Sequence, residues 1–203
     1  MKKRFNQVYQ FKITLKGIKP PVWRQIQVPE TYTFWDLHVA IQDVMGWEDY
    51  HLHEFEMMNH FTGKKVRIGL PHEDYDWSRE TLPGWKQKIA EYFSMKTRLA
   101  IYTYDFGDNW EHIIKLEKII PREVNTEYPV CMAGERACPP EDCGGPWGYE
   151  EFLRIIRNPK HKEHKEMLEW IGGEFNSEHF DPKKIKFDDP DKRKKAELKM
   201  KLS

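Results

Sequence analysis

The sequence is short of cysteine, of hydrophobic runs and of any excess of one charge. Its three cysteines, Cys131, Cys138 and Cys143, are an odd number. In the absence of a recognisable N-terminal signal, this predicts reduced thiols rather than a disulfide framework. Lysine plus arginine and aspartate plus glutamate each number 33, so the formal net charge is +0. Because no global field attracts nucleic acid or lipid, such a partner would have to meet a local patch.

No stretch approaches the roughly 20 apolar residues that cross a bilayer, and the charged start, MKKRFNQVYQF, has no apolar run behind it. We therefore expect a cytoplasmic protein with no membrane partner. With 203 residues, 39% hydrophobic and 33% charged, the chain is long enough to bury a core. The expected organisation is a single domain over residues 1–187, followed by a basic C-terminal helix or tail over residues 188–203.

Hydrophobic periodicity predicts the order strand, strand, helix, strand in the first part of the chain. Alternating apolar residues indicate strands at 8–17 and 22–28 that pair as a hairpin. Thr33 and Asp36 have the spacing of a capping box before a helix at 34–45, which Gly46 ends, and alternation returns at 51–58. This order is similar to a β-grasp. We therefore predict an α+β fold with a mixed, mostly antiparallel sheet, a β-grasp-like N-terminal unit and covering helices.

The same patterns predict the remaining elements. Residues 64–68 indicate a short strand, 71–79 an acidic aromatic loop, and 85–93 a helix with a broad apolar stripe. Strands at 99–104 and 110–119 are expected to form a hairpin. A loop is expected at 128–134. Helices are predicted at about 149–156, which Pro159 ends, at 164–171, and, exposed and fraying, after Pro190.

Residues 104–112, YDFGDNWEH, form the most unusual stretch. Its Asp-Phe-Gly letters match the metal-binding tripeptide of protein kinases, but the glycine-rich and catalytic loops of kinases are missing upstream. Turn chemistry explains Asp108, whereas Asp105 has less need to be acidic for the turn and could reach a metal or a basic partner. His112 shares a strand face with apolar residues, so a place in the core is favoured over ligation.

Histidines and cysteines offer further metal-ligand candidates. His51 and His53, two residues apart on one expected strand, could deliver two imidazoles to one ion, although burial beside Phe55 competes with this interpretation. The cysteines are separated by six and four residues, wider than most structural zinc sites use, so zinc is not favoured. No cofactor is predicted beyond a divalent metal, for which the candidate ligands are His51, His53, Asp105 and Cys143.

A second unusual stretch, residues 139–145 (PPEDCGG), places Glu141 and Asp142 between proline and glycine. Such a loop can leave carboxylates exposed, and the following helix could hold an anion at its N-terminus. Alternatively, the loop is rigid and docks that helix. The candidate functional surface therefore comprises His51, His53, Asp105, Asp108, His112, Glu141 and Asp142.

A basic run occurs near the end of the sequence. Such runs are usually solvated surface, but this one could add weak contacts to phosphate groups of nucleic acid. The candidates are Lys192, Arg193, Lys194 and Lys195.

Taken together, the motifs resemble the plasmid pRiA4b Orf-three-like domain family. The resemblance rests on residues 21–24 (PVWR), 33–38, 46–47, 51–55 (HLHEF), 104–112, 139–145 and 175–180. It implies an α+β fold, without a firmly established activity, in bacterial and archaeal proteins of which some are attached to mobile elements. A resolvase activity, a label that some members carry, does not fit, because none of Ser78, Ser94, Ser177 and Ser203 has the setting of a recombinase nucleophile.

No nucleophile and base stand out as a pair, which favours a non-catalytic binding or interaction module. Its partner would be a protein, with weak nucleic-acid contact through the tail, and it could serve a mobile element or a nucleic-acid system. The alternative is a metal-dependent hydrolase or nuclease that uses a His/Asp/Glu cluster, which requires the candidate side chains to converge in space.

Overall fold

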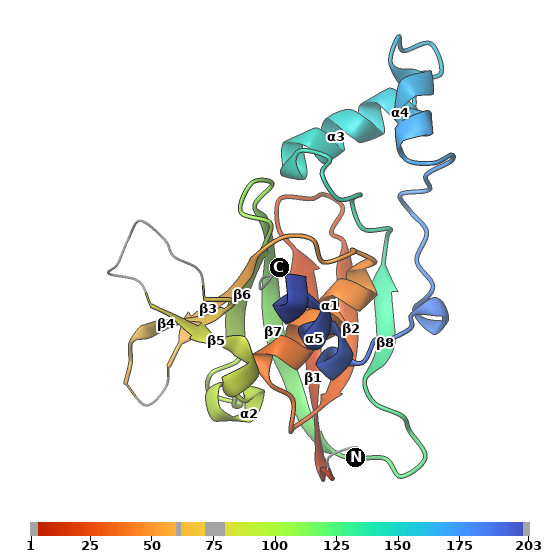
Figure 1. Ribbon diagram of the computed structural model, residues 1–203. Coiled ribbons are helices and arrows are strands. Elements are labelled where there is room, and N and C mark those ends of the chain that lie inside the picture. Colours follow the sequence, from red (N-terminus) through yellow and green to blue (C-terminus); the bar gives the residue numbers. More distant parts are fainter. Residues whose placement is uncertain (1–3, 60–61, 72–79, 201–203) are drawn as a thin grey trace.

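The computed structural model describes residues 4–59, 62–71 and 80–200. Its centre is one eight-stranded sheet in the order β5-β4-β3-β6-β7-β1-β2-β8 (Figure 1). All neighbouring strands are antiparallel except β4 and β5, so the predicted mixed, mostly antiparallel sheet is confirmed. The strands are β1 (Gln7–Leu15), β2 (Trp23–Pro29), β3 (His53–Met58), β4 (Lys65–Gly69), β5 (Thr81–Pro83), β6 (Leu99–Tyr104), β7 (Trp110–Pro121) and β8 (Val130–Glu135).

The predicted β-grasp-like unit is not seen in this sheet. Two strands, β6 and β7, separate β3 from β1, so the N-terminal elements do not form a compact sheet of their own. Instead, β7 pairs with β1 along the whole length of β1, from Leu15↔His112 to Gln7↔Pro121. Because this pairing joins residues about a hundred positions apart, the order of elements along the chain could not reveal it.

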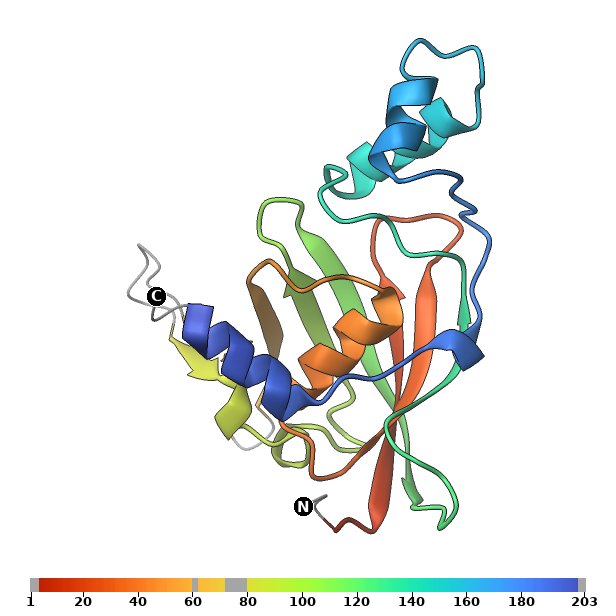
Figure 2. The ribbon, with the colours of Figure 1, turned by 45° about the vertical axis from the view of Figure 1, so that its right-hand side comes forward.

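Helix α1 (Phe34–Met45) has the predicted bounds. Thr33 Oγ1 accepts a hydrogen bond from the Asp36 amide at 3.2 Å, and Asp36 Oδ2 accepts one from the Thr33 amide at 2.8 Å, which completes the capping box. Gly46, at φ 84°, ends the helix in the left-handed conformation. Helix α1 lies across one face of the sheet, and the last helix, α5 (Pro190–Met200), lies over α1 (Figures 1 and 2).

Two local predictions are wrong. In place of a helix at 85–93 there are a 3-10 turn, η1 (Gly84–Lys86), and a single turn, α2 (Ile89–Tyr92), because Gln87 and Lys88 between them are extended and Lys88 bridges to Thr33. In place of the loop expected at 128–134, β8 forms the edge of the sheet beside β2. The loop predicted at 71–79 falls mostly on residues 72–79, outside the described ranges.

Two helices project from one end of the sheet (Figure 2). They are α3 (Gly145–Ile156) and α4 (His164–Trp170), and the 3-10 turn η2 (Pro182–Lys184) follows them. Both helices were predicted from their apolar spacing. Among the helices of the described chain, none has the length and hydropathy needed to cross a membrane.

Candidate functional site

Three loops meet beside the first turn of α3 and carry most of the predicted site residues. His51 Nε2 lies 2.9 Å from Asp142 Oδ1 and 3.7 Å from Asp105 Oδ2. Asp108 Oδ2 accepts a hydrogen bond from the Gly144 amide at 3.0 Å. The two unusual stretches of the sequence are thus joined, with His51 between them. We call this region the junction surface, and it comprises His51, Asp105, Asp108, Glu141 and Asp142.

Of the two aspartates of the 104–112 stretch, Asp105 combines a role in the turn with the basic neighbour predicted for it. Asp105, at φ 56°, accepts a hydrogen bond from the Gly107 amide through Oδ1 at 2.9 Å, so it is Asp105 that caps the turn. Its second oxygen faces His51. Asp108 lies in the turn, as expected, and its side chain also accepts a hydrogen bond from the neighbouring loop at Gly144.

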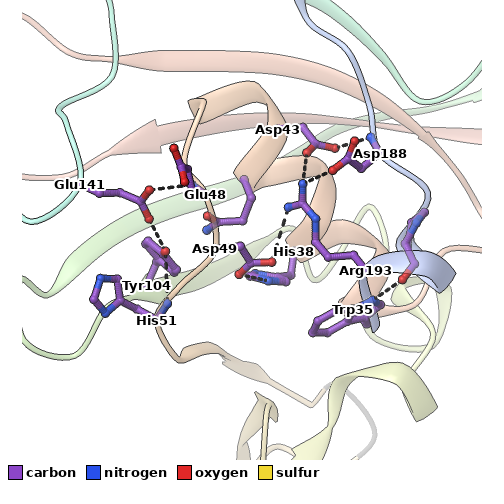
Figure 3. Close-up of polar contacts among 12 residues, drawn as sticks. Trp35, His38, Asp43, Glu48, Asp49, His51, Tyr104, Glu141, Asp188 and Arg193 are labelled. Atoms are coloured by element: carbon purple, nitrogen blue, oxygen red, sulfur yellow. Dashed lines mark hydrogen bonds and ion pairs between the residues drawn. The ribbon is translucent and has the colours of Figure 1, made fainter. Parts of the chain in front are cut away.

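Glu141 links its own loop to Tyr104 at the end of β6 and to Glu48 in the loop after α1 (Figure 3). Its carboxylate accepts hydrogen bonds from the Tyr104 hydroxyl and, at 2.6 Å, from the Glu48 amide. Exposed aromatic side chains are neighbours of the junction surface along the chain. Tyr50, Phe106 and Trp147 are 71%, 44% and 84% exposed; Tyr50 precedes His51, Phe106 follows Asp105, and Trp147 lies in the first turn of α3.

Two side chains beside the junction surface, Cys143 and Tyr104, have a displaced pKa, and neither is an activated nucleophile. Burial raises the pKa of the Cys143 thiol to about 12, which keeps the thiol protonated at neutral pH. Burial, and next the Glu141 carboxylate, raises the pKa of Tyr104 well above its ordinary value of 10.0. No described cysteine belongs to a group of residues able to hold a metal ion, so nothing supports Cys143 as a ligand.

His53 lies away from the junction surface, because β3 begins at His53 and His51 precedes it in a bend. The predicted convergence of His51 and His53 on one ion is therefore not found. The His53 ring instead stacks on His38 of α1, with centroids 3.4 Å apart and ring planes 7° from parallel. Asp49 Oδ1 lies 2.9 Å from His38 Nε2. We call His38, Asp49 and His53 the buried histidine cluster.

The sequence did not single out His38 or Asp49. A readable signal existed, since His38 and Gln42 are polar residues four positions apart on the buried side of α1. Both bond the Tyr102 hydroxyl, His38 through Nδ1 at 2.8 Å and Gln42 through Nε2 at 2.9 Å. A polar pair at this spacing inside an apolar helix face indicates a buried polar partner.

His112 is fully buried, as its strand face predicted, and Nδ1 lies 3.3 Å from the Tyr102 carbonyl oxygen. Burial lowers the pKa of its imidazole from 6.5 to about 4. Unfolding restores the ordinary pKa, so the unfolded state binds more protons between these two values and His112 makes folding less favourable as the pH falls through them. Asp43 and Asp49 act in the opposite direction, because burial raises the pKa of each carboxyl from 3.8 to about 6.

Because His112 and the two aspartates change the stability in opposite directions, the pH dependence of wild type alone does not separate them, and a His112 variant does. Relative to wild type, His112→Gln is expected to gain about 2 kcal/mol of unfolding free energy as the pH falls from 6.5 to 4.5, because the titration penalty is removed. Urea unfolding at each pH measures the difference. The exposed His179→Gln is the control. A difference that stays constant with pH would contradict the expectation.

The basic run lies on α5, and its members differ in setting. Arg193 faces inward and pairs with Asp43 at 2.8 Å, with Asp49 at 3.5 Å and with Asp188 (Figure 3). Lys194 lies 3.6 Å from Asp191, whereas Lys192 and Lys195 are exposed. Arg193 is thus engaged within the chain, and nucleic-acid contact through the exposed lysines stays a prediction.

The fold and the junction surface define an α+β protein with a histidine and several carboxylates gathered where three loops meet. A family model described as plasmid pRiA4b ORF-3-like protein matches residues 7–184, and the chain belongs to this family. The resemblance found in the sequence motifs is confirmed. The matched region ends before α5.

Two relatives extend the comparison. The uncharacterized protein y4hQ of Sinorhizobium fredii (strain NBRC 101917 / NGR234) is 40% identical over 170 residues, which cover 81% of each chain. The crystal structure of MM3350 from Methanosarcina mazei Go1, described as a protein of unknown function, is 50% identical and superimposes with a TM-score of 0.85. The alignment covers 91% of this chain and 100% of that one.

Proposed function

We propose that this protein is a non-catalytic binding module that recognises a positively charged segment of a protein partner through the junction surface. The observation that carries the proposal is the position of His51 between the carboxylates of Asp105 and Asp142. Carboxylates arranged around a single imidazole leave an excess of negative charge. That charge suits the lysine and arginine side chains of a partner.

The exposed aromatic side chains support the same kind of partner. Tyr50, Phe106 and Trp147 are exposed in the loops and the helix turn that carry or adjoin the carboxylates, and a cation over such a ring gains roughly 0.5–2 kcal/mol. Arginine is the cation best suited to this combination, because its guanidinium both stacks on rings and pairs with carboxylates. The family description refers to a plasmid, which supports a role beside a mobile element or its nucleic-acid system.

A labelled peptide with alternating arginine and glycine tests the proposal directly. Fluorescence anisotropy is expected to show binding that weakens about tenfold in Asp142→Asn and in Trp147→Ala, since each change removes one charged or aromatic contact worth about 1.4 kcal/mol. Both side chains are exposed, so neither change should disturb the fold. The exposed Glu174→Gln is a control for loss of one negative charge elsewhere. Equal binding of a glutamate-containing peptide would refute the proposal.

A metal-dependent hydrolase or nuclease is the second candidate. His51, Asp105 and Asp142 each offer one ligand atom, and these atoms lie within 4.8 Å of one another. This candidate requires cleavage of a phosphodiester or peptide substrate that depends on added Mn²⁺ or Mg²⁺ and is lost in Asp142→Asn. Metal-dependent turnover of this kind would replace the binding proposal.

A further inference from the structure

The buried histidine cluster combines two imidazoles and a carboxylate where a folded chain ordinarily has apolar side chains. His38 and His53 are 0% and 1% exposed, and Asp49 lies beside them with its side chain 9% exposed. Potential ligand atoms of these three residues lie within 4.8 Å of one another. The cluster is separate from the junction surface, whose group of potential ligands shares none of its members.

The contact between His38 and Asp49 has the geometry of two ligands rather than of a hydrogen bond. Nε2 and Oδ1 are 2.9 Å apart, yet Nε2 is buried without a partner that meets the geometry of a hydrogen bond. Two atoms that each lie ~2.1 Å from one ion are about 3.0 Å apart at an angle of about 90° and about 3.4 Å apart at the tetrahedral angle of Zn²⁺ sites, so a Zn²⁺ ion would move the two atoms apart by about 0.5 Å. A cation between the two atoms would satisfy both.

The other ring nitrogen of His38, Nδ1, is held in place by a hydrogen-bond partner. Nδ1 lies 2.8 Å from the Tyr102 hydroxyl, which also accepts a hydrogen bond from Gln42 Nε2. Histidines that bind metals typically have the second ring nitrogen held by such an outer partner, which sets the ring orientation. His38 is therefore oriented with Nε2 toward Asp49, as a ligand would be.

Charge around the cluster also favours a cation. The single guanidinium of Arg193 faces three carboxylates, those of Asp43, Asp49 and Asp188 (Figure 3). One positive charge thus faces three carboxylates, of which those of Asp43 and Asp49 are nearly buried, with side chains 5% and 9% exposed. A second positive charge next to Asp49 would stabilise its ionised form.

From these observations we propose that His38, Asp49 and His53 form a buried binding site for a divalent transition metal ion, with Arg193 of α5 as its cover. Two imidazoles and one carboxylate select Zn²⁺ or Fe²⁺ over Mg²⁺ and Ca²⁺, which prefer oxygen ligands. Because the two imidazole planes are stacked, one ion cannot lie in both, so binding turns one ring out of the stack. The covered position makes this site one for structure or regulation rather than for turnover.

Titration of the full chain, freed of metal by a chelator and then dialysed, tests the site with Zn²⁺ as the probe. One equivalent of Zn²⁺ is expected to bind and to resist competition from millimolar Mg²⁺. His38→Gln and Asp49→Asn are each expected to weaken Zn²⁺ binding more than about 100-fold, because even the outer partners of metal ligands contribute about 10- to 100-fold. Circular dichroism checks that both near-isosteric variants remain folded.

Two further variants distinguish Zn²⁺ binding in the buried histidine cluster from binding at the junction surface. Arg193→Met is expected to tighten Zn²⁺ binding about tenfold, since it removes a competing positive charge from Asp49, whereas a purely structural role of Arg193 would give weaker binding. His51→Gln should leave Zn²⁺ binding unchanged, because His51 belongs to the junction surface. Absence of Zn²⁺ binding, or binding that His51→Gln removes and Asp49→Asn keeps, would overturn the proposal without touching the peptide-binding one.

Discussion

Replacing Arg24 with alanine is expected to lower the free energy of unfolding by about 4 kcal/mol. The side chain is 1% exposed and ties three segments together. Its Nε donates to the Val44 carbonyl at 2.8 Å, and one terminal nitrogen donates to the carbonyls of Trp23 and Glu135 at 2.8 and 2.9 Å. Each buried carbonyl left without a donor costs about 1–3 kcal/mol.

Lysine at position 24 is not expected to restore the stability that arginine provides. A single ammonium cannot reach carbonyls on α1, β2 and β8 together, whereas the guanidinium does so from one plane. The guanidinium also stacks on the Phe180 ring, 3.7 Å from its centroid, and so connects the sheet to the segment that follows α4. Arg24→Lys should therefore recover less than half of the lost stability.

Denaturant unfolding of three variants measures this effect. Arg98→Ala is the matched control, because Arg98 also donates to a carbonyl, that of Met95 at 2.8 Å, but lies on the surface. Its loss is expected to cost less than about 1 kcal/mol. If Arg24→Ala costs no more than Arg98→Ala, the carbonyl contacts of Arg24 do not stabilise the fold.

Elements with local signals could be predicted from the sequence. The β1–β2 hairpin follows from alternation over two adjacent segments, and α1 follows from a cap, an apolar stripe and a terminal glycine. The β8 strand carries no comparable signal. It is an edge strand in which Gly134 packs against the Phe180 ring, where an added Cβ would lie 2.4 Å from a ring carbon, and this reason for a glycine is visible only in three dimensions.

The candidate site was predictable in its parts but not in its grouping. The sequence indicated His51, Asp105 and Asp142 as site residues, and these do converge. His53 was grouped with them because the predicted strand began at residue 51, two residues before β3 begins. The buried histidine cluster was missed because its members come from α1, the following loop and β3. Asp49 sits there in the left-handed conformation, at φ 67°, and nothing in its neighbours along the chain indicates that position.

Gly148→Ala is expected to disrupt the junction surface and to lower the free energy of unfolding by about 3 kcal/mol or more. A Cβ at this position would lie 1.8 Å from the Cys143 carbonyl oxygen, far inside van der Waals contact. The obstacle is backbone, so no side-chain rotation relieves it, and overpacking that moves backbone typically costs about 1–3 kcal/mol and at times more. The Cys143 carbonyl must move, and with it both neighbouring residues.

Those neighbours carry the contacts on which the proposed function depends. Asp142 faces His51 at 2.9 Å, and the Gly144 amide donates to Asp108 at 3.0 Å. Displacing the loop separates the two halves of the junction surface, so Gly148→Ala should lose binding of the arginine peptide while Zn²⁺ binding by the buried histidine cluster persists. Gly84→Ala is the control, because its Cβ would come no closer than 3.4 Å to other atoms. Hydrogen exchange at the Gly144 amide is the most direct measurement. Faster exchange in Gly148→Ala, but not in Gly84→Ala, would mean that the close approach of α3 to this loop holds the two stretches together.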